Sequence, residues 1–283
     1  MQVAVLGMGS MGRAFAGRAL AGGHQVTVWN RSPGRTDDLV AEGAVAADSV
    51  AAAVAGAEVV LTVVADDDAL LAVCLGGDGV LEHLGPAAIL VNSSTVAPDT
   101  IRRLADAVPD GRVVDAPVLG SPDAVAGGHA RFFVGCPPEV AAFLEPLWGD
   151  LGAGITLCGP VGTAATMKLM CNLLLITGVA ALAEGIATAR SQGIPDELIR
   201  TVLSAVPVVA PSGVVRLDSL LDGAHPGWFT PELARKDVRL AIDLADQTSV
   251  GVRLGPATEA LLTTVVDAGG RWPDVTAVIE ALG

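Results

Sequence analysis

Lys168 and Asn172 are polar residues in an otherwise apolar stretch, and their types and spacing could support proton transfer. They are four residues apart, which places both side chains on one face of a helix. Burying an ammonium group there is costly unless an anionic or polar group receives it. Lys168 could face an anionic or polar group in a functional site, or it could be a structural lysine that extends to water at the helix edge. The spacing leaves both interpretations open.

A second pair of charged residues, Lys236 and Asp237, lies in a predicted helix. Leu233, Leu240 and Leu244 recur with Asp237 at helical spacing, which puts the carboxylate in the apolar stripe. A buried carboxylate beside a lysine is either an ion pair between domains or a part of a functional site. The sequence does not decide between the two.

The segment Gly7-Met8-Gly9-Ser10-Met11-Gly12 follows the apolar run 3–6 and precedes a helix-like stretch, 13–21. This order is typical of the strand, tight turn and helix start of a dinucleotide-binding unit. The glycines let the backbone turn sharply and approach a pyrophosphate. The N–H groups and positive dipole end of the helix would then meet the phosphate charge.

The next predicted strand, 25–29, ends in Asn30-Arg31-Ser32. NAD-binding units usually place Asp or Glu about 20 residues after the glycines, where it receives the ribose hydroxyls. A neutral Asn followed by Arg suits a 2′-phosphate instead. The sequence therefore predicts NADP(H) as the cofactor.

The elements that must position these residues fall into two series. Short apolar runs alternate with Ala-rich helical stretches at 3–6, 26–29, 59–64, 88–91, 112–114 and 131–134. From Val161 onward, long helical patterns follow at 162–191, 196–206, 212–221, 231–248 and 255–267. The chain is thus predicted to be of α/β class, with a doubly wound parallel sheet in a Rossmann domain over 1–160. An all-helical domain over 161–283 follows, and helix 162–191 joins the two.

Three polar segments follow predicted strands, where ligands of open α/β sheets bind. Residues 65–68, Ala-Asp-Asp-Asp, are predicted to cap the next helix and to touch a cofactor only through their backbone. Residues 92–98 carry three hydroxyls, which either face a ligand or cap a helix at 98–107. Residues 115–121 form a loop with exposed backbone that could hold a carboxylate.

Composition excludes several classes of protein. The 283 residues are 51% apolar but only 3% aromatic, so a core of Ala, Val and Leu is expected. A formal charge of −14 disfavours nucleic acid and anionic membranes as partners. The four cysteines, at 74, 136, 158 and 171, show no metal-ligand spacing, so no metal site is expected and buried, reduced thiols are predicted.

The location of the protein is also predicted from the sequence. The first strand begins at Gln2 and leaves no room for an export signal, so a cytoplasmic protein is expected. The longest apolar segment, 167–183, contains Lys168 and Asn172 and is shorter than the roughly 20 residues that span a bilayer. It is predicted to be a buried helix.

The chain as a whole resembles the β-hydroxyacid dehydrogenase family, whose members include 3-hydroxyisobutyrate dehydrogenases. The matching blocks are the glycine motif, Ser94-Thr95 with Pro98, Pro117 to Ser121, Gly162 through Lys168 to Asn172, and Phe229 with Leu233 and Lys236-Asp237. Residues 116–121 and Asn30-Arg31 look most like the glyoxylate and succinic semialdehyde reductase branch, which uses NADPH. Asn92 stands where the family commonly has Asp, and Leu119 where most members have Ser.

This resemblance implies roles for individual residues. Lys168 would be the general acid of a hydride transfer to a small aldehyde or keto acid, and Asn172 would orient the substrate. The implied substrate pocket contains Ser94, Thr95, Gly120, Ser121, Phe229 and Asp237. The implied cofactor contacts, besides residues 7–12 and 30–32, are Val64, Ala65, Thr95 and Lys236.

Two alternative functions remain open, and the sequence also predicts an oligomer. Imine reductases and reductive aminases share the architecture, but they typically have Asp or Tyr where this chain has Lys168. A non-catalytic NADPH-binding sensor is an alternative from another functional class. The presence of Lys168 and Asn172 argues against it. The apolar joining helix, 162–191, predicts a homodimer or homotetramer.

Overall fold

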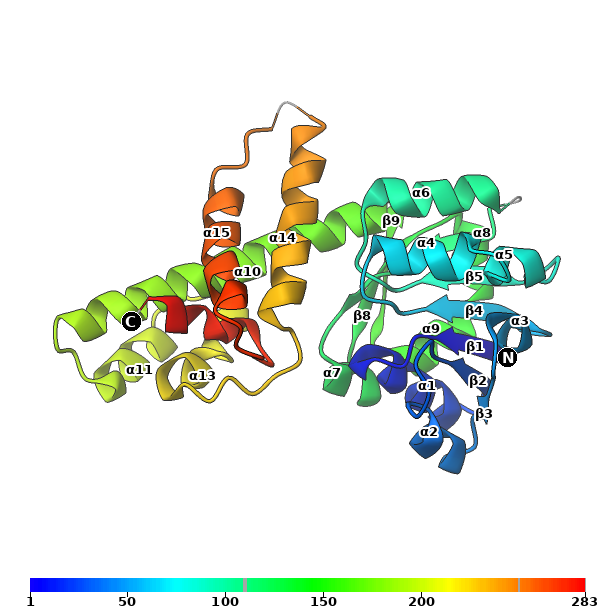
Figure 1. Cartoon of the computed structure of the whole chain (residues 1–283), viewed down its shortest axis with the longest axis horizontal. Helices are drawn as coiled ribbons and strands as arrows, with labels where there is room; N and C mark the ends of the chain where they lie inside the picture. Colours follow the sequence, from blue (N-terminus) through cyan, green and yellow to red (C-terminus); the bar gives the residue numbers. More distant parts are fainter. Residues whose placement is uncertain (109–110, 249, 283) are drawn as a thin grey trace. The chain divides into compact units, whose positions relative to one another are not determined.

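The short apolar runs of the first half form the strands of one sheet (Figure 1). The central strands bury side chains on both faces of that sheet. The computed structural model describes residues 1–108, 111–248 and 250–282. The predicted strands are β1 (Gln2–Leu6), β2 (Gln25–Trp29), β4 (Val59–Thr62), β5 (Ile89–Asn92), β6 (Val113–Asp115) and β8 (Arg131–Gly135). All six predicted strands are therefore confirmed, with ends shifted by at most two residues.

Three further strands are too short or too exposed to be read from the sequence. They are β3 (Val45–Ala46), β7 (Val118–Leu119) and β9 (Gly154–Gly159). The sheet order is β3-β2-β1-β4-β5-β6-β8-β7, and β9 pairs with β8. The expectation of a purely parallel sheet is wrong at this edge, because β8 runs antiparallel to both β6 and β7. Parallel neighbours need a crossover of roughly a dozen residues or more. Only residues 120–130 join β7 to β8, so the chain turns back antiparallel there.

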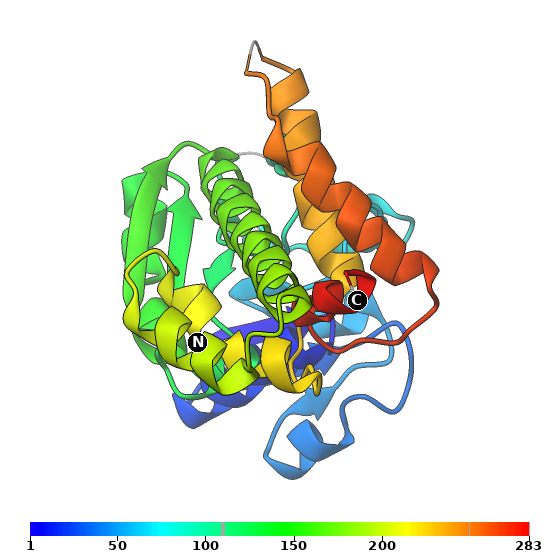
Figure 2. The same ribbon diagram turned by 90° about the vertical axis from the view of Figure 1, so that its left-hand side faces the viewer.

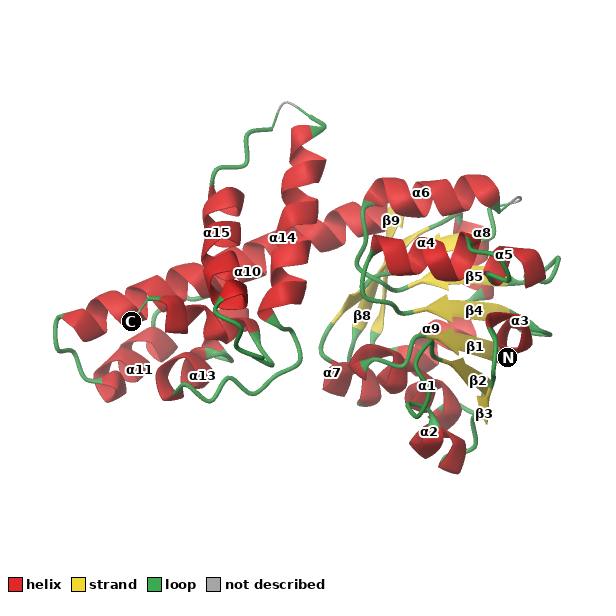
Figure 3. Cartoon of the chain, in the orientation of Figure 1, coloured by secondary structure: helices red, strands yellow, loops and turns green. Residues whose placement is uncertain are grey.

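Helices cover both faces of the sheet, as Figure 3 shows. Successive side chains of a strand point to opposite faces, so Val3 and Val5 pack with α1 while Ala4 and Leu6 pack on the other side. One face carries α1 (Ser10–Ala21), α2 (Asp37–Ala41), α7 (Pro122–Ala126), α8 (Pro138–Phe143) and α9 (Glu145–Leu151). The other carries α3 (Val50–Val54), α4 (Asp67–Leu75), α5 (Val80–His83) and α6 (Pro98–Ala107). The α/β fold class and the Rossmann order are confirmed.

The chain divides into two compact units, Met1–Lys168 and Leu169–Gly283. The division falls within α10 (Thr163–Ser191), which begins in unit 1 and continues through unit 2. The predicted boundary at 160/161 lies just before this helix and stays a prediction.

Every regular element among the described residues of unit 2 is a helix. Its further elements are α11 (Asp196–Ala205), α12 (Pro211–Val214), α13 (Leu217–Asp222), α14 (Pro231–Asp246), α15 (Leu254–Asp267) and the 3₁₀ helix η1 (Val275–Ala281). Figure 2 shows α14 and α15 side by side as an antiparallel pair. The predicted single helix at 212–221 is wrong, because the N–H of Arg216 bonds three residues back to Gly213 and closes a tight turn. The Arg216 guanidinium there meets the buried carboxylate of Asp274 at 3.6 Å.

α10 contributes one face to the core of unit 2, so the prediction of a buried helix at 167–183 is only partly right: 39% of its most apolar stretch is buried. Its length and its mean hydropathy of 1.9 would also suit a membrane span, but the core helix of a soluble protein passes the same test. Ile176, Val179, Ala183 and Ile186 are at most 1% exposed and belong to the hydrophobic core of unit 2.

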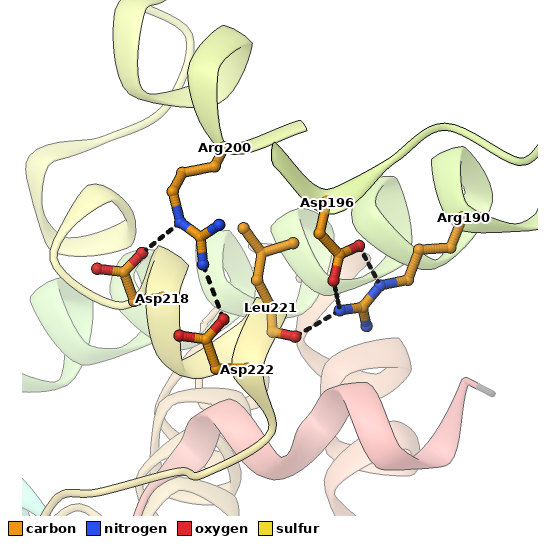
Figure 4. A network of polar contacts seen from close by, with 6 residues as sticks. All are labelled: Arg190, Asp196, Arg200, Asp218, Leu221 and Asp222. Carbon is orange, nitrogen blue, oxygen red and sulfur yellow. Dashed lines mark hydrogen bonds and ion pairs between the residues drawn. The ribbon is translucent and has the colours of Figure 1, made fainter. Parts of the chain in front are cut away.

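Ion pairs fix the end of α10 to its neighbours in unit 2 (Figure 4). Arg190 binds Asp196 through two hydrogen bonds, of 2.9 and 2.8 Å, and donates to the carbonyl of Leu221 at 2.6 Å. Arg200 of α11 reaches Asp218 and Asp222 of α13 at 2.7 and 2.8 Å. A network of this kind holds the α10–α11 turn against α13, although each exposed pair contributes little by itself.

Candidate active site

The loops of interest in unit 1 all leave the carboxyl end of the sheet. β1 lies between β2 and β4, so the strand order reverses beside it. Ligands of open α/β sheets bind outside the carboxyl ends of the strands at such a point. The glycine loop follows β1, Asn30–Ser32 follow β2, and Val64–Ala65 follow β4. The predicted cofactor residues of unit 1 therefore come together at one edge of the sheet.

Packing requires two of the three motif glycines, and the third leaves space. Gly7 has φ +104°, and an added Cβ would lie 2.2 Å from the carbonyl oxygen of Val63. A Cβ on Gly12 would lie 1.8 Å from the carbonyl oxygen of Gly7. Gly9 has no atom within 4 Å of such a Cβ. The loop can thus turn tightly, and a ligand can approach its backbone at Gly9.

Gly9 is also the residue from which α1 starts. No side chain of the described residues caps this helix end. The first N–H groups of a helix have no partner within it, and together with the helix dipole they favour an anion. The loop therefore fits the pyrophosphate of a dinucleotide.

Asn30 joins the glycine loop to the end of β2. Its side-chain oxygen accepts the N–H of Met8 at 2.8 Å, and its amide donates to the carbonyl of Ser32 at 2.8 Å. The neighbouring Arg31 is exposed. By contrast, Arg13 of α1 forms an ion pair with Asp38, and this contact lowers the pKa of the Asp38 carboxyl.

The three hydroxyls after β5 do not cap α6. The helix has Ala97 at its N-cap and no side-chain cap, so the capping alternative for this segment is wrong. Asp67 of α4 instead contacts the start of α6, accepting the N–H of Ala97 at 2.9 Å and the hydroxyl of Thr100 at 2.5 Å. Asp66 caps its own helix through the N–H of Ala69 at 2.8 Å, as predicted.

The buried serines instead tie neighbouring loops together. Ser94 is 4% exposed, and its hydroxyl accepts the N–H of Val64 at 2.9 Å. Ser93 donates to the carbonyl of Ala116 at 2.8 Å. Thr95, which follows them, is half-buried. Ser94 thus links the loop after β5 to the loop after β4.

Gly120 and Ser121 follow β7 in unit 1. Gly120 has φ +147°, and the Ser121 hydroxyl caps α7 by accepting the N–H of Ala124 at 3.1 Å. A serine hydroxyl that accepts one bond keeps its own hydrogen for donation. Ser121 can therefore cap its helix and still donate to a substrate.

The predicted residues of unit 2 form a second group. Asp237 on α14 is 3% exposed, and its carboxylate accepts the side-chain amide of Asn172 at 2.5 Å. Lys236 lies 2.9 Å from the same carboxylate, so the ion pair lies within one helix and does not join two domains. Phe229 is 8% exposed and packs on Trp228 at the start of this region.

α10 connects Lys168 to this group. Lys168 is half-buried, and Asn172 lies one turn further along the helix. Because Asp237 fixes the Asn172 amide, the part of this helix face that lies in unit 2 has a defined polar partner. Lys168 and Lys236 are also the two lysines of the whole chain. The scarcity of lysine in the chain is a sequence signal that singles out both residues as candidate functional residues, and the spacing of the motifs did not reveal it.

The cysteines are not part of either group. All four are free, with Cys74 and Cys136 buried and Cys158 and Cys171 half-buried. The prediction of buried thiols is thus wrong for the last two. Burial raises the pKa of the Cys74 thiol to about 12, so it is not a nucleophile at neutral pH.

Known families match both halves of the chain. Residues 2–159 match the NAD-binding domain of 6-phosphogluconate dehydrogenase, and residues 162–282 match the NAD-binding domain of NADP-dependent 3-hydroxyisobutyrate dehydrogenase. The chain belongs to the β-hydroxyacid dehydrogenase family. It is therefore an NAD(P)-dependent oxidoreductase with a small-molecule substrate, and the glycine loop described above fits the nicotinamide cofactor.

Individual relatives are similar over their full length. An uncharacterized oxidoreductase, YfjR, of Bacillus subtilis is 32% identical, and the match covers 100% of both chains. Glyoxylate/succinic semialdehyde reductase 1 of Arabidopsis thaliana is 29% identical over 100% of this chain and 98% of its own. The solved structure of Psf3 in complex with NADP+ and 2-OPP is 26% identical, covers 99% of this chain and 100% of its own, and has a TM-score of 0.88.

Proposed function

We propose that this β-hydroxyacid dehydrogenase uses NADPH to reduce a small aldehyde or keto acid to the hydroxy acid, with Lys168 as the general acid. The observation that carries this proposal is the face of α10 on which Lys168 and Asn172 lie one turn apart, with Asn172 fixed by Asp237 at 2.5 Å. The similarity to a glyoxylate/succinic semialdehyde reductase supports the substrate class.

NADPH is favoured over NADH by the residues at the end of β2. Asn30 is neutral and already engaged with the glycine loop, so it offers no carboxylate to ribose hydroxyls. Arg31 is exposed beside it and can meet a 2′-phosphate. Gly7, Gly9 and Gly12, with Ser10 and Met11, would hold the pyrophosphate, and the backbone at Val64 and Ala65 would flank the nicotinamide.

The chain's own residues supply the proton and the orientation. When bound, NADPH supplies a hydride to the carbonyl carbon of the substrate. Lys168 donates its proton as negative charge develops on the carbonyl oxygen. Reduction consumes a proton, and the ammonium group of a lysine carries one to give, so reduction is the favoured direction. Asn172 orients the substrate, and the hydroxyls of Thr95 and Ser121 hold its polar end.

A panel of substrates with the purified enzyme tests this function. We expect NADPH consumption with glyoxylate, succinic semialdehyde or a related keto acid, and a lower kcat/KM with NADH. Turnover of a cyclic imine without turnover of any carbonyl would instead identify an imine reductase. Binding of NADPH without turnover of either class would identify a non-catalytic sensor.

The proposal includes a homodimer or larger assembly in the cytoplasm. Met170, Leu174, Gly178, Ala181 and Gly185 are exposed along one face of α10, with Leu174 at 68%. Beside this face, α10, α11 and α12 enclose an apolar groove of about 580 Å³, which includes Val202 and Val208. Exposed apolar surface of this kind marks an interaction site, and a second copy would cover it. The free cysteines suit a reducing compartment.

The assembly is tested by light scattering at micromolar concentration. We expect a mass of at least twice the 28.4 kDa of one chain. Leu174→Glu should lower that mass to the monomer, because a carboxylate on this face cannot be buried against a neighbour. Val40→Glu, at another exposed apolar position on a helix, is the matched control and should leave the mass unchanged. A wild-type monomer would refute the proposal.

A further inference from the structure

Asp115 is a buried carboxylate at the end of β6 to which the chemistry described above gives no role. The residue is fully buried. One oxygen, Oδ2, accepts the backbone N–H of Gly162 at 3.1 Å and that of Ala165 at 2.8 Å. The other oxygen, Oδ1, is buried and has no hydrogen-bond partner in the part of the chain that the structure describes. The carboxylate thus binds the first turn of α10, about 50 residues further along the chain.

The first turn of α10 needs an acceptor from elsewhere. The first N–H groups of a helix are usually satisfied by a Ser, Thr, Asp or Asn side chain just before it. Gly162 occupies that position with φ +93°, a backbone conformation that L side chains rarely adopt. The position therefore favours glycine, which has no side chain to cap the helix.

Asp115 takes the place of the missing cap, and its charge suits the site. The N–H of Ala165, the third residue of the helix, is the group that a capping side chain normally binds. The positive end of the helix dipole also favours a carboxylate. Burial raises the pKa of Asp115 to about 6, while the N–H groups of Ala165 and Gly162 and the charge of Arg102 oppose that rise. The group is therefore mostly ionised at neutral pH.

Lys168 lies three residues beyond Ala165 on the same helix, about 4.5 Å further along its axis. We propose that Asp115 is a positioning residue, which holds the first turn of α10 to the sheet and thereby fixes where the Lys168 ammonium points. This inference rests on the proposed role of Lys168 as general acid. Displacing a catalytic group by about 1 Å can lower a rate by about 100-fold, so the anchor of this turn affects the chemical step.

Two substitutions at Asp115 separate positioning from general destabilisation. Asp115→Ala removes the acceptor, and we expect kcat to fall about 10- to 100-fold with the Kd of NADPH within threefold. Asp115→Asn keeps one oxygen that can accept both N–H groups, so it should restore kcat to within threefold of wild type. If Asp115→Ala does not fold, Asp115→Ser replaces it, because the shorter side chain also withdraws the acceptor. A folded Asp115→Ala or Asp115→Ser enzyme with normal kcat would overturn the inference.

A second measurement does not depend on activity. Reductive methylation with ¹³C-formaldehyde labels the two lysines and the N-terminal amine, so NMR reports the environment of Lys168 directly. We expect the Lys168 signal to shift in Asp115→Ala and not in Asp115→Asn, while the Lys236 signal stays in place as an internal control. An unmoved Lys168 signal would count against the inference. A shifted signal combined with normal turnover by Lys168→Ala would support the positioning by Asp115 and refute the proposed function.

Discussion

Helices α1 and α10 both start directly after a glycine, but their first turns meet different partners. Gly9 precedes α1, and no side chain among the described residues caps that end. Gly162 precedes α10, and the buried carboxylate of Asp115 accepts two N–H groups there. The first N–H groups of a helix need hydrogen-bond acceptors. No side chain of the described residues supplies one at α1, whereas Asp115 supplies one at α10.

The difference separates binding from positioning. An open terminus beside the reversal of strand order keeps its N–H groups for an anionic ligand. The start of α10 is fixed to the sheet by the buried carboxylate of Asp115. Its position therefore sets the position of the residues one turn later. We therefore expect substitutions near α1 to change cofactor affinity, and substitutions on α10 to change the chemical step.

The largest effect should come from Lys168→Ala. Positioned acid catalysis typically contributes about 10²- to 10⁴-fold, so kcat should fall by that factor while the Kd of NADPH stays within threefold. Steady-state kinetics and cofactor titration by fluorescence measure the two quantities. Lys168→Arg is the matched control, because it keeps the charge but releases its proton far less readily, and it should also be slow. A kcat near wild type, with only the melting temperature changed, would indicate a structural lysine. It would also contradict the expectation that substitutions on α10 change the chemical step.

Arg31→Ala should produce the next largest effect, and on binding alone. A charge-assisted contact to phosphate contributes roughly 1.5–3 kcal/mol, so the Kd of NADPH should rise about 10- to 100-fold. The Kd of NADH, which lacks the 2′-phosphate, should not change. Arg103→Ala, at another exposed arginine, serves as the control. An unchanged preference for NADPH in Arg31→Ala would remove this residue from the cofactor site.

The buried Asp115 should make stability depend on pH. Its pKa of about 6 in the folded protein lies above the ordinary 3.8, so the folded state binds a proton more readily than the unfolded state. This contribution to the unfolding free energy therefore rises as the pH falls through 6, by about 1 kcal/mol between pH 7 and 5. Denaturant unfolding of wild type and Asp115→Asn at both pH values measures it as the difference between the two proteins. Equal pH dependence of the two would show that the carboxyl does not titrate in this range.

Ser121 provides a smaller test of whether one hydroxyl has both functions. Ser121→Ala should lower the unfolding free energy by about 0.5–2 kcal/mol through loss of the α7 cap, whereas Ser121→Gly should cost only a few tenths. Both variants lose the hydroxyl, so both should raise the KM of the carbonyl substrate severalfold. If KM rises only in the destabilised Ser121→Ala and not in Ser121→Gly, the serine is a cap and does not contact the substrate.

Much of the fold followed from local patterns in the sequence. Apolar runs gave the six main strands within two residues, and helical periodicity gave α10, α11, α14 and α15 with similar accuracy. The glycine loop was also evident, because the φ of +104° at Gly7 and the packing of Gly12 against the Gly7 carbonyl both arise within a single strand–turn–helix unit. These features arise from residues that are close together in the chain, so the sequence alone is enough to predict them.

The tertiary structure alone decided the partners of the polar groups. Asp67 of α4 binds the start of α6, Asp115 of β6 binds the start of α10, and Asn172 meets Asp237, which is 65 residues away in the chain. The antiparallel edge at β7 and β8 and the break between α12 and α13 were likewise not evident from periodicity. A hydrogen bond satisfies whichever buried group packing brings within 3 Å, and local sequence patterns do not encode that distance. The residue types at the site were therefore determined by the sequence, and which side chain holds which in place was determined by the packing.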